Sequence, residues 1–204
     1  MMMLCIAVGL APAFKMKFWN IGAEGQILVG GIATAACMIY LGGSVPTPLL
    51  LLIMMVVSIV AGGVWGLIPG IFKARWGTNE TLFTLMMNYV AIQFTSYAVS
   101  KWENPVGSNS VGVINQTSRA GWFPSIFGQA YTLNVIIVLA LAAAMYIYLK
   151  YSKQGSEISV VGDSENTARY AGISVRKVYI RTMFLSGAIC GIAGFLAVSG
   201  SSHT

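Results

Sequence analysis

Polar side chains interrupt two apolar stretches of this sequence, and all of them are suited to hydrogen bonding. The first stretch reads Asn20-Ile21-Gly22-Ala23-Glu24-Gly25-Gln26. In the second, Thr81, Thr84, Asn88 and Thr95 fall on one face of a helix that advances about 100° per residue. Amides and hydroxyls on an apolar helix are expected to face the bundle interior or a water-filled path, where they suit a neutral, hydrogen-bonding solute. We therefore predict a solute pathway lined by Asn20, Glu24, Gln26, Thr84, Asn88 and Thr95.

Each stretch also has a simpler interpretation. The glycines at 22 and 25 break helical regularity, and irregular backbone within a membrane must be satisfied by protein or by a water-filled cavity. The alternative is an interfacial helix start with Glu24 solvated near Lys15 and Lys17. The threonines can bond back to their own helix carbonyls, which leaves only Asn88 to cross to a neighbouring helix. The residues alone leave both alternatives open.

A third polar stretch, from Lys150 to Arg181, carries six of the chain's twelve Lys and Arg residues. Within it, Asp163 and Ser164 are N-cap residues, Glu165 is an acid in a first helical turn, and Gly172 is a helix stop. The pattern predicts a two-turn helix from Glu165 to Ala171. A helix this short is unstable alone, so something must dock it.

The sequence gives little indication of a catalytic or metal-binding site. Cys5, Cys37 and Cys190 lie in apolar runs without ligand spacing, and the single histidine, His203, is the penultimate residue. No glycine-rich loop ending in Gly-Lys-Ser/Thr is present, so this chain has no phosphate cradle of its own for ATP. We predict that the protein is not an enzyme and that it has no catalytic residue, metal or cofactor. We also predict no nucleic-acid partner. The basic residues lie in short clusters between apolar runs, where membrane topology accounts for the net charge of +6.

The elements that position these residues are membrane-spanning helices. Of the 204 residues 56% are hydrophobic and 9% are charged, whereas soluble domains average about 25% charged residues. The mean hydropathy is +0.74. We predict an all-α, polytopic membrane protein with about six spans, the first partial, at Met1–Phe14, Ile21–Leu41, Pro48–Phe72, Thr78–Ser100, Tyr131–Leu149 and Thr182–Gly200.

Charge asymmetry orients these spans. If residues 150–181 are cytoplasmic, alternation places ten of the twelve basic residues inside and leaves only Lys101 and Arg119 outside. Glycines also recur every four residues, at 62, 66 and 70 and at 187 and 191. This spacing lets helix backbones approach closely, either for gating or for ordinary bundle packing.

Three stretches resemble one family of transport proteins, the ABC importer permeases of the simple sugar and nucleoside branch (the branched-chain amino acid/ribose-type superfamily). They are Asn20–Gln26, Lys73–Tyr89 and Gly162–Ile173. The resemblance implies one transmembrane permease domain over 1–204, incomplete at both ends, with 150–181 as its cytoplasmic coupling loop. Relatives usually carry Asn-Pro where this chain has Ser164-Glu165. The resemblance assigns ATPase coupling to Gly162, Glu165, Ala168, Arg169, Tyr170, Ala171, Gly172 and Ile173.

The same resemblance implies a role and partners. The chain is expected to be the permease subunit of an importer in a bacterial inner membrane, with ATP hydrolysed by a separate cytoplasmic chain. A second permease subunit, identical or different, and an extracytoplasmic substrate-binding protein complete the expected assembly. The form of residues 20–26 favours nucleosides over a simple sugar such as ribose. Two other classes remain: an ATP-independent secondary transporter or channel, and a membrane scaffold whose basic loop binds anionic lipid.

Overall fold

The structure is a computed structural model that describes residues 1–116, 119–124 and 131–202. Regular secondary structure in the described residues is helical, which confirms the predicted all-α class. The helices are α1 (Met2–Lys15), α2 (Ala23–Leu41), α3 (Thr47–Trp76), α4 (Glu80–Trp102), α5 (Thr132–Tyr151), α6 (Lys153–Asp163), α7 (Glu165–Tyr170) and α8 (Val175–Ala197), with a π-helical turn, η1 (Val198–Ser202), after α8.

Among the described residues, five helices are long and apolar enough to cross a membrane, namely α2, α3, α4, α5 and α8 with its π-helical continuation. The helix α1 is apolar but shorter, as expected for a partial first span. The sixth predicted span starts too late, because α8 begins at Val175 rather than Thr182. This extra length is amphipathic: Val175 and Val178 are buried, whereas Arg176 and Lys177 face outward.

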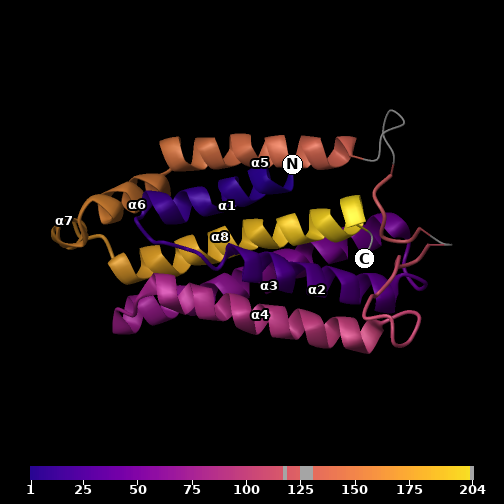
Figure 1. The fold of residues 1–204 in the computed structure, drawn as a ribbon. Helices are drawn as coiled ribbons and strands as arrows, with labels where there is room; N and C mark the ends of the chain where they lie inside the picture. The colour runs from indigo at the N-terminus through magenta and orange to yellow at the C-terminus, as the bar shows by residue number, and fades with distance from the viewer. Residues whose placement is uncertain (117–118, 125–130, 203–204) are drawn as a thin grey trace.

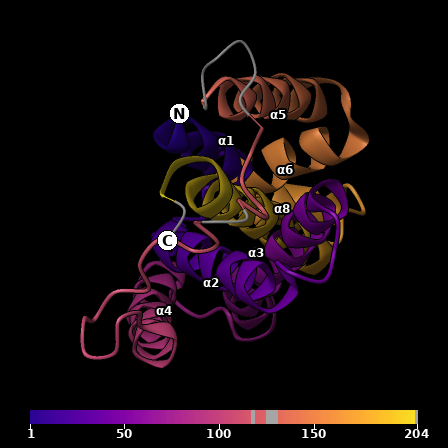
Figure 2. The same ribbon diagram turned by 90° about the vertical axis from the view of Figure 1, so that its right-hand side faces the viewer.

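The helix α8 forms the centre of the bundle (Figures 1 and 2). Within an apolar stretch of 18 residues in α8, 83% of the residues are buried, against 17% in the corresponding stretches of α4 and α5, which lie at the periphery. The glycines explain how α3 approaches it so closely. A Cβ added at Gly187 would lie 2.3 Å from the carbonyl oxygen of Gly62, and one at Gly66 would lie 2.7 Å from the carbonyl oxygen of Met183. The predicted close helix packing is therefore present between α3 and α8.

The helices run lengthwise between two different ends (Figure 1). One end carries α6, α7 and the first turn of α8, and Lys15 at the end of α1 donates a hydrogen bond to the carbonyl of Leu149 there, over 3.1 Å. The opposite end carries the long loop between α4 and α5. The basic segments expected on one side of the membrane thus gather at one end of the molecule. The positive-inside rule identifies that end as cytoplasmic.

A second helix in the basic loop, α6, was not predicted. Ser152 begins it by accepting a hydrogen bond from the backbone N–H of Gly155 over 2.9 Å. Ile158 and Val161 are buried on its inner face, where they pack against the end of α1 and the start of α8. Asp163 ends this helix, so Ser164 alone caps α7, contrary to the expected pair of N-cap residues.

Candidate functional site

The helix α7 has the start and the stop that its sequence predicts. The side chain of Ser164 accepts a hydrogen bond from the backbone N–H of Thr167, which satisfies a donor of the first turn. Gly172 follows the helix at φ +75°, a left-handed conformation that costs little only for glycine. The backbone N–H of Gly172 donates to the carbonyl of Arg169 over 3.0 Å, and the N–H of Ile173 donates to the carbonyl of Ala168 over 2.9 Å. These bonds close the C-terminus of α7.

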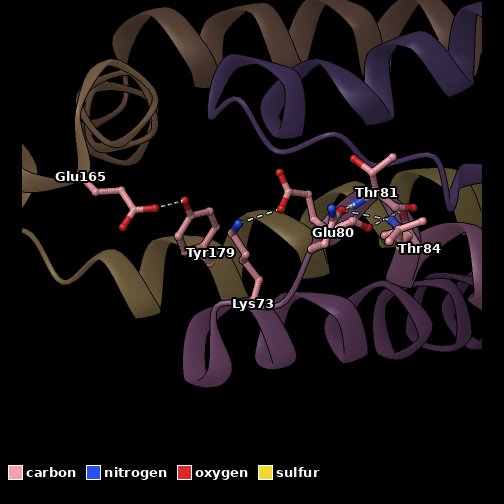
Figure 3. Close-up of polar contacts among 8 residues, drawn as sticks. Lys73, Glu80, Thr81, Thr84, Glu165 and Tyr179 are labelled. Carbon is pink, nitrogen blue, oxygen red and sulfur yellow. Dashed lines mark hydrogen bonds and ion pairs between the residues drawn. The ribbon is translucent and has the colours of Figure 1, made fainter.

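The protein's own chain holds α7 in place. Ala168 is fully buried among Phe18, Ile158 and Val178. The hydroxyl of Tyr179 on α8 donates a 2.7 Å hydrogen bond to the carboxylate of Glu165 (Figure 3). Ala168 and Glu165 therefore fix the position of α7 from the inside. Of the predicted coupling residues, Gly162 is also internal, because a Cβ there would lie 2.3 Å from the carbonyl oxygen of Lys15.

The outer side of α7 presents four of the remaining coupling candidates, whereas the fifth, Ile173, is partly buried and packs against the core beneath the helix. Tyr170 is 93% exposed, and Arg169, Ala171 and Gly172 are exposed as well. Arg169 pairs with Glu165 one turn away at 3.5 Å, an exposed ion pair of little energetic value that leaves the guanidinium accessible. An exposed tyrosine beside an arginine is a composition typical of binding surfaces.

A polar groove of about 460 Å³ runs beside α7, between the end of α3 and the start of α8. Its charged lining is mostly basic and includes Lys73, Arg75, Arg169 and Arg176 together with Glu165. Lys73 also forms an ion pair of 2.7 Å with Glu80, which joins the end of α3 to the first residue of α4 (Figure 3).

Four of the six predicted pathway residues meet in one buried cluster inside the bundle. Asn20 and Gln26, each 1% exposed, face each other in a reciprocal amide pair with two hydrogen bonds of 3.4 Å. Asn20 also donates to the hydroxyl of Ser186 on α8 over 3.3 Å. The cluster has no charged side chain. Ser186 is not among the predicted pathway residues, and its signal in the sequence is its place beside Gly187 of α8.

Asn88 and Thr84 on α4 bind backbone rather than side chains. Asn88 accepts a 2.8 Å hydrogen bond from the N–H of Gly25 and donates one of 2.9 Å to the carbonyl of Ile21. The hydroxyl of Thr84 accepts from the N–H of Ile21 over 3.2 Å, and it lies 2.7 Å from the carbonyl of Glu80 on its own helix. The protein thus satisfies the irregular backbone before α2. The break lies before Gly22, because α2 is regular from Ala23 onward and passes through Gly25.

The other two predicted pathway residues lie apart from this cluster. Glu24 is exposed on the opposite side of the first turn of α2. Thr95 donates to the carbonyl of Ala91 on its own helix over 2.9 Å and lines an apolar cavity of about 190 Å³ among α2, α4 and α8. Thr95 therefore bonds back to its own helix, as the simpler interpretation predicts for the threonines. Asn88 and Thr84 both bond to a neighbouring segment, whereas that interpretation allowed this only for Asn88.

The amino-acid sequence matches one known family of membrane proteins. The family model described as "Branched-chain amino acid transport system / permease component" matches residues 1–203. The chain belongs to this family. The permease is 35% identical over 201 residues to a guanosine ABC transporter permease protein of Bacillus subtilis (strain 168), covering 96% of this chain and 57% of the relative.

Two further relatives show the range of solutes named within the family. The permease is 28% identical to a nucleoside ABC transporter permease protein of Lactococcus lactis subsp. cremoris (strain MG1363), over 94% of this chain and 55% of the relative. It is 30% identical to a glucose ABC transporter permease protein of Haloferax volcanii, over 96% of this chain and 54% of the relative. The chain therefore spans about half the length of these curated relatives. No solved structure matches the permease.

Proposed function

We propose that this permease is the membrane subunit of an ATP-driven importer for nucleosides in a bacterial inner membrane. The observation that carries the proposal is the buried, uncharged cluster of Asn20, Gln26 and Ser186. An ion entering it would meet no counter-charge, whereas a neutral molecule rich in hydrogen-bonding groups would find both donors and acceptors. The names of the guanosine and nucleoside relatives favour a nucleoside as that molecule.

The lengths of the hydrogen bonds divide the cluster into an exchangeable part and a fixed part. The bonds among Asn20, Gln26 and Ser186 measure 3.3–3.4 Å, longer than the usual N–H···O distance of about 2.9–3.0 Å. Those of Asn88 measure 2.8–2.9 Å and satisfy backbone groups. The long bonds cost little to replace with bonds to a solute. We assign solute contact to Asn20 and Gln26, and positioning of the backbone to Asn88. Thr84 accepts a bond of 3.2 Å from the N–H of Ile21 and is grouped with Asn88 because its partner is also a backbone group.

The driving partner is a cytoplasmic ATPase that docks on the exposed side of α7. Tyr170, Arg169 and Ala171 present this surface, and the basic groove beside α7 extends it. A second permease subunit and an extracytoplasmic substrate-binding protein complete the importer that we propose. In the complete importer, Arg169→Glu should leave membrane insertion intact and abolish substrate-stimulated ATP hydrolysis. Normal stimulation would show that α7 is only a connector.

Two other functions make different predictions. A simple sugar is the alternative within the family, and the relative named for glucose favours it. A transporter driven by an ion gradient would need an ionisable residue in the pathway, yet Glu80 is paired with Lys73 and Glu24 is exposed. These positions support the ATP-driven proposal over an ion-coupled one.

Uptake of labelled solutes separates these functions. Cells with and without the complete importer would be given guanosine, uridine, ribose and glucose in turn, each with and without depletion of ATP. We expect uptake of the nucleosides only, and only with the importer and ATP present. Uptake of a sugar alone would refute the nucleoside assignment and keep the class of transporter. Uptake that persists without ATP would refute both.

A further inference from the structure

The segment of residues 16–22 connects α1 to α2 and alternates between the interior and the surface. Its backbone is a series of turns, in which the N–H groups of Asn20 and Ile21 donate to the carbonyls of Phe18 and Trp19 over 3.0 and 3.2 Å. Three of its side chains are at most 2% exposed, and the three that alternate with them are exposed. The buried ones are Met16, Phe18 and Asn20, and the exposed ones are Lys17, Trp19 and Ile21.

The first half of this segment belongs to the core beneath α7. Phe18, 1% exposed, packs in one cluster with Ala168 of α7 and Tyr179 of α8. The rings of Phe18 and Tyr179 lie 6.0 Å apart between centroids. Because the hydroxyl of Tyr179 holds Glu165 over 2.7 Å, one side chain contacts both α7 and the segment.

The second half belongs to the polar cluster. Asn20 bonds Gln26 and Ser186, and both backbone groups of Ile21 are held by side chains of α4. A single residue separates Phe18 from Asn20, and the backbone N–H of Asn20 donates a 3.0 Å hydrogen bond to the carbonyl of Phe18. The segment therefore has little slack with which to absorb a movement of Phe18. Close-packed interiors pass such displacements on to their neighbours.

We propose that Tyr179 and Phe18 are positioning residues that carry a displacement of α7 to Asn20. When the ATPase moves α7, Tyr179 moves with Glu165, Phe18 follows the ring of Tyr179, and Asn20 leaves its long hydrogen bonds to Gln26 and Ser186. The solute contacts of the cluster then change in step with ATP hydrolysis. This inference rests on the proposed function, because it takes the ATPase at α7 and the solute at Asn20 from it.

The chain offers a matched control for the hydroxyl of Tyr179. Tyr148 on α5 donates a 2.7 Å hydrogen bond to the side chain of Gln154, at the same end of the molecule. It also packs against the same core cluster. Tyr179→Phe and Tyr148→Phe each remove one hydroxyl and keep the ring, but only the first change cuts a bond to α7.

The two variants would be compared in the complete importer reconstituted into vesicles, with the solute that the unmodified importer carries. We expect Tyr179→Phe to lower the amount of solute imported per ATP hydrolysed about tenfold, the effect of losing one hydrogen bond to a charged group. The amount of assembled complex and its basal ATP hydrolysis should stay unchanged. Tyr148→Phe should keep the ratio within about twofold of the unmodified importer. An equal fall in both variants, or no fall in Tyr179→Phe, would overturn the proposal.

A second measurement follows the segment itself and needs no transport. Ile21 is 46% exposed and uses only its backbone in the cluster, so Ile21→Cys can report movement there in a background without the native cysteines. The rate of its reaction with a thiol reagent should differ between the nucleotide-free importer and one locked by a non-hydrolysable ATP analogue. With Tyr179→Phe the difference should disappear. Equal rates in both states of the unmodified importer would refute the proposed movement even if nucleoside uptake is confirmed. A difference that persists in Tyr179→Phe would refute the role of Tyr179.

Discussion

The contact between α3 and α8 predicts that Gly187→Ala destabilises the permease. A Cβ at Gly187 would lie 2.3 Å from the carbonyl oxygen of Gly62 and 3.1 Å from the Cα of Gly66. Both neighbours are backbone atoms, which cannot rotate away as the end of a side chain can. The two helices must therefore move apart at a contact that involves α8, the most buried of the five spans in the described residues.

The size of the effect follows from this geometry. Ordinary contacts begin at 3.4 Å, so the helices must separate by about 1 Å, and overpacking of this kind costs about 1–3 kcal/mol. Alanine returns up to about 1 kcal/mol through its higher helix propensity. A net loss of about 1–2 kcal/mol lowers Tm by about 2–8 °C in a protein of this size.

Gly31→Ala is the matched control, because it makes the same change inside α2 where space is available. The nearest atoms to its added Cβ lie 3.8 and 4.0 Å away, so this variant should gain about 2–4 °C from propensity alone. The assay is the fraction of detergent-solubilised permease that stays monodisperse after heating. Equal or higher stability of Gly187→Ala would refute the packing of α3 on α8. A loss as large for Gly31→Ala would show that any added methyl group is harmful.

The remaining predictions concern the cluster, the C-terminus of α7 and the orientation. Gln26→Leu should raise the KM for uptake and leave the amount of folded permease unchanged. Asn88→Leu should instead lower the amount of folded permease, because two buried backbone groups lose their hydrogen-bond partners at about 1–3 kcal/mol each. Gly172→Val forces a branched side chain into a left-handed conformation, at about 1–2 kcal/mol, and should abolish substrate-stimulated ATP hydrolysis without loss of insertion. A cysteine placed at Ser156 should react with an impermeant reagent only after the membrane is opened, and one at Ser110 should react in intact cells. The reverse labelling pattern would overturn the orientation.

Several features of this protein follow from the sequence because they depend on local physics. The length and apolarity of a run decide whether its helix can span a bilayer, and the bounds of α2 to α5 lie close to the predicted ones. The cap at Ser164 and the stop at Gly172 act within one helical turn, so α7 was predictable to within a residue of its end. The four-residue spacing of glycines likewise indicates a close helix contact before its partner is known.

Which surfaces meet was decided only by the tertiary structure. Helical periodicity places Thr84, Asn88 and Thr95 on one face, but the segment before α2 covers only the first two, so Thr95 bonds to its own helix. The packing of the helices also leaves Glu24 exposed and places Ser186 within hydrogen-bonding distance of Asn20.

The helix α6 and the early start of α8 also depend on the tertiary structure. The α6 segment contains glycine and serine, and both segments contain β-branched residues, all of weak helix propensity. They become helical because Ile158, Val161 and Val178 bury apolar surface against one another beneath α7. Burial of this kind joins residues far apart in the chain. The local signals, the cap at Ser152 and the three-residue spacing of Val175 and Val178, do not show which surface buries these residues, and only the folded chain brings them together.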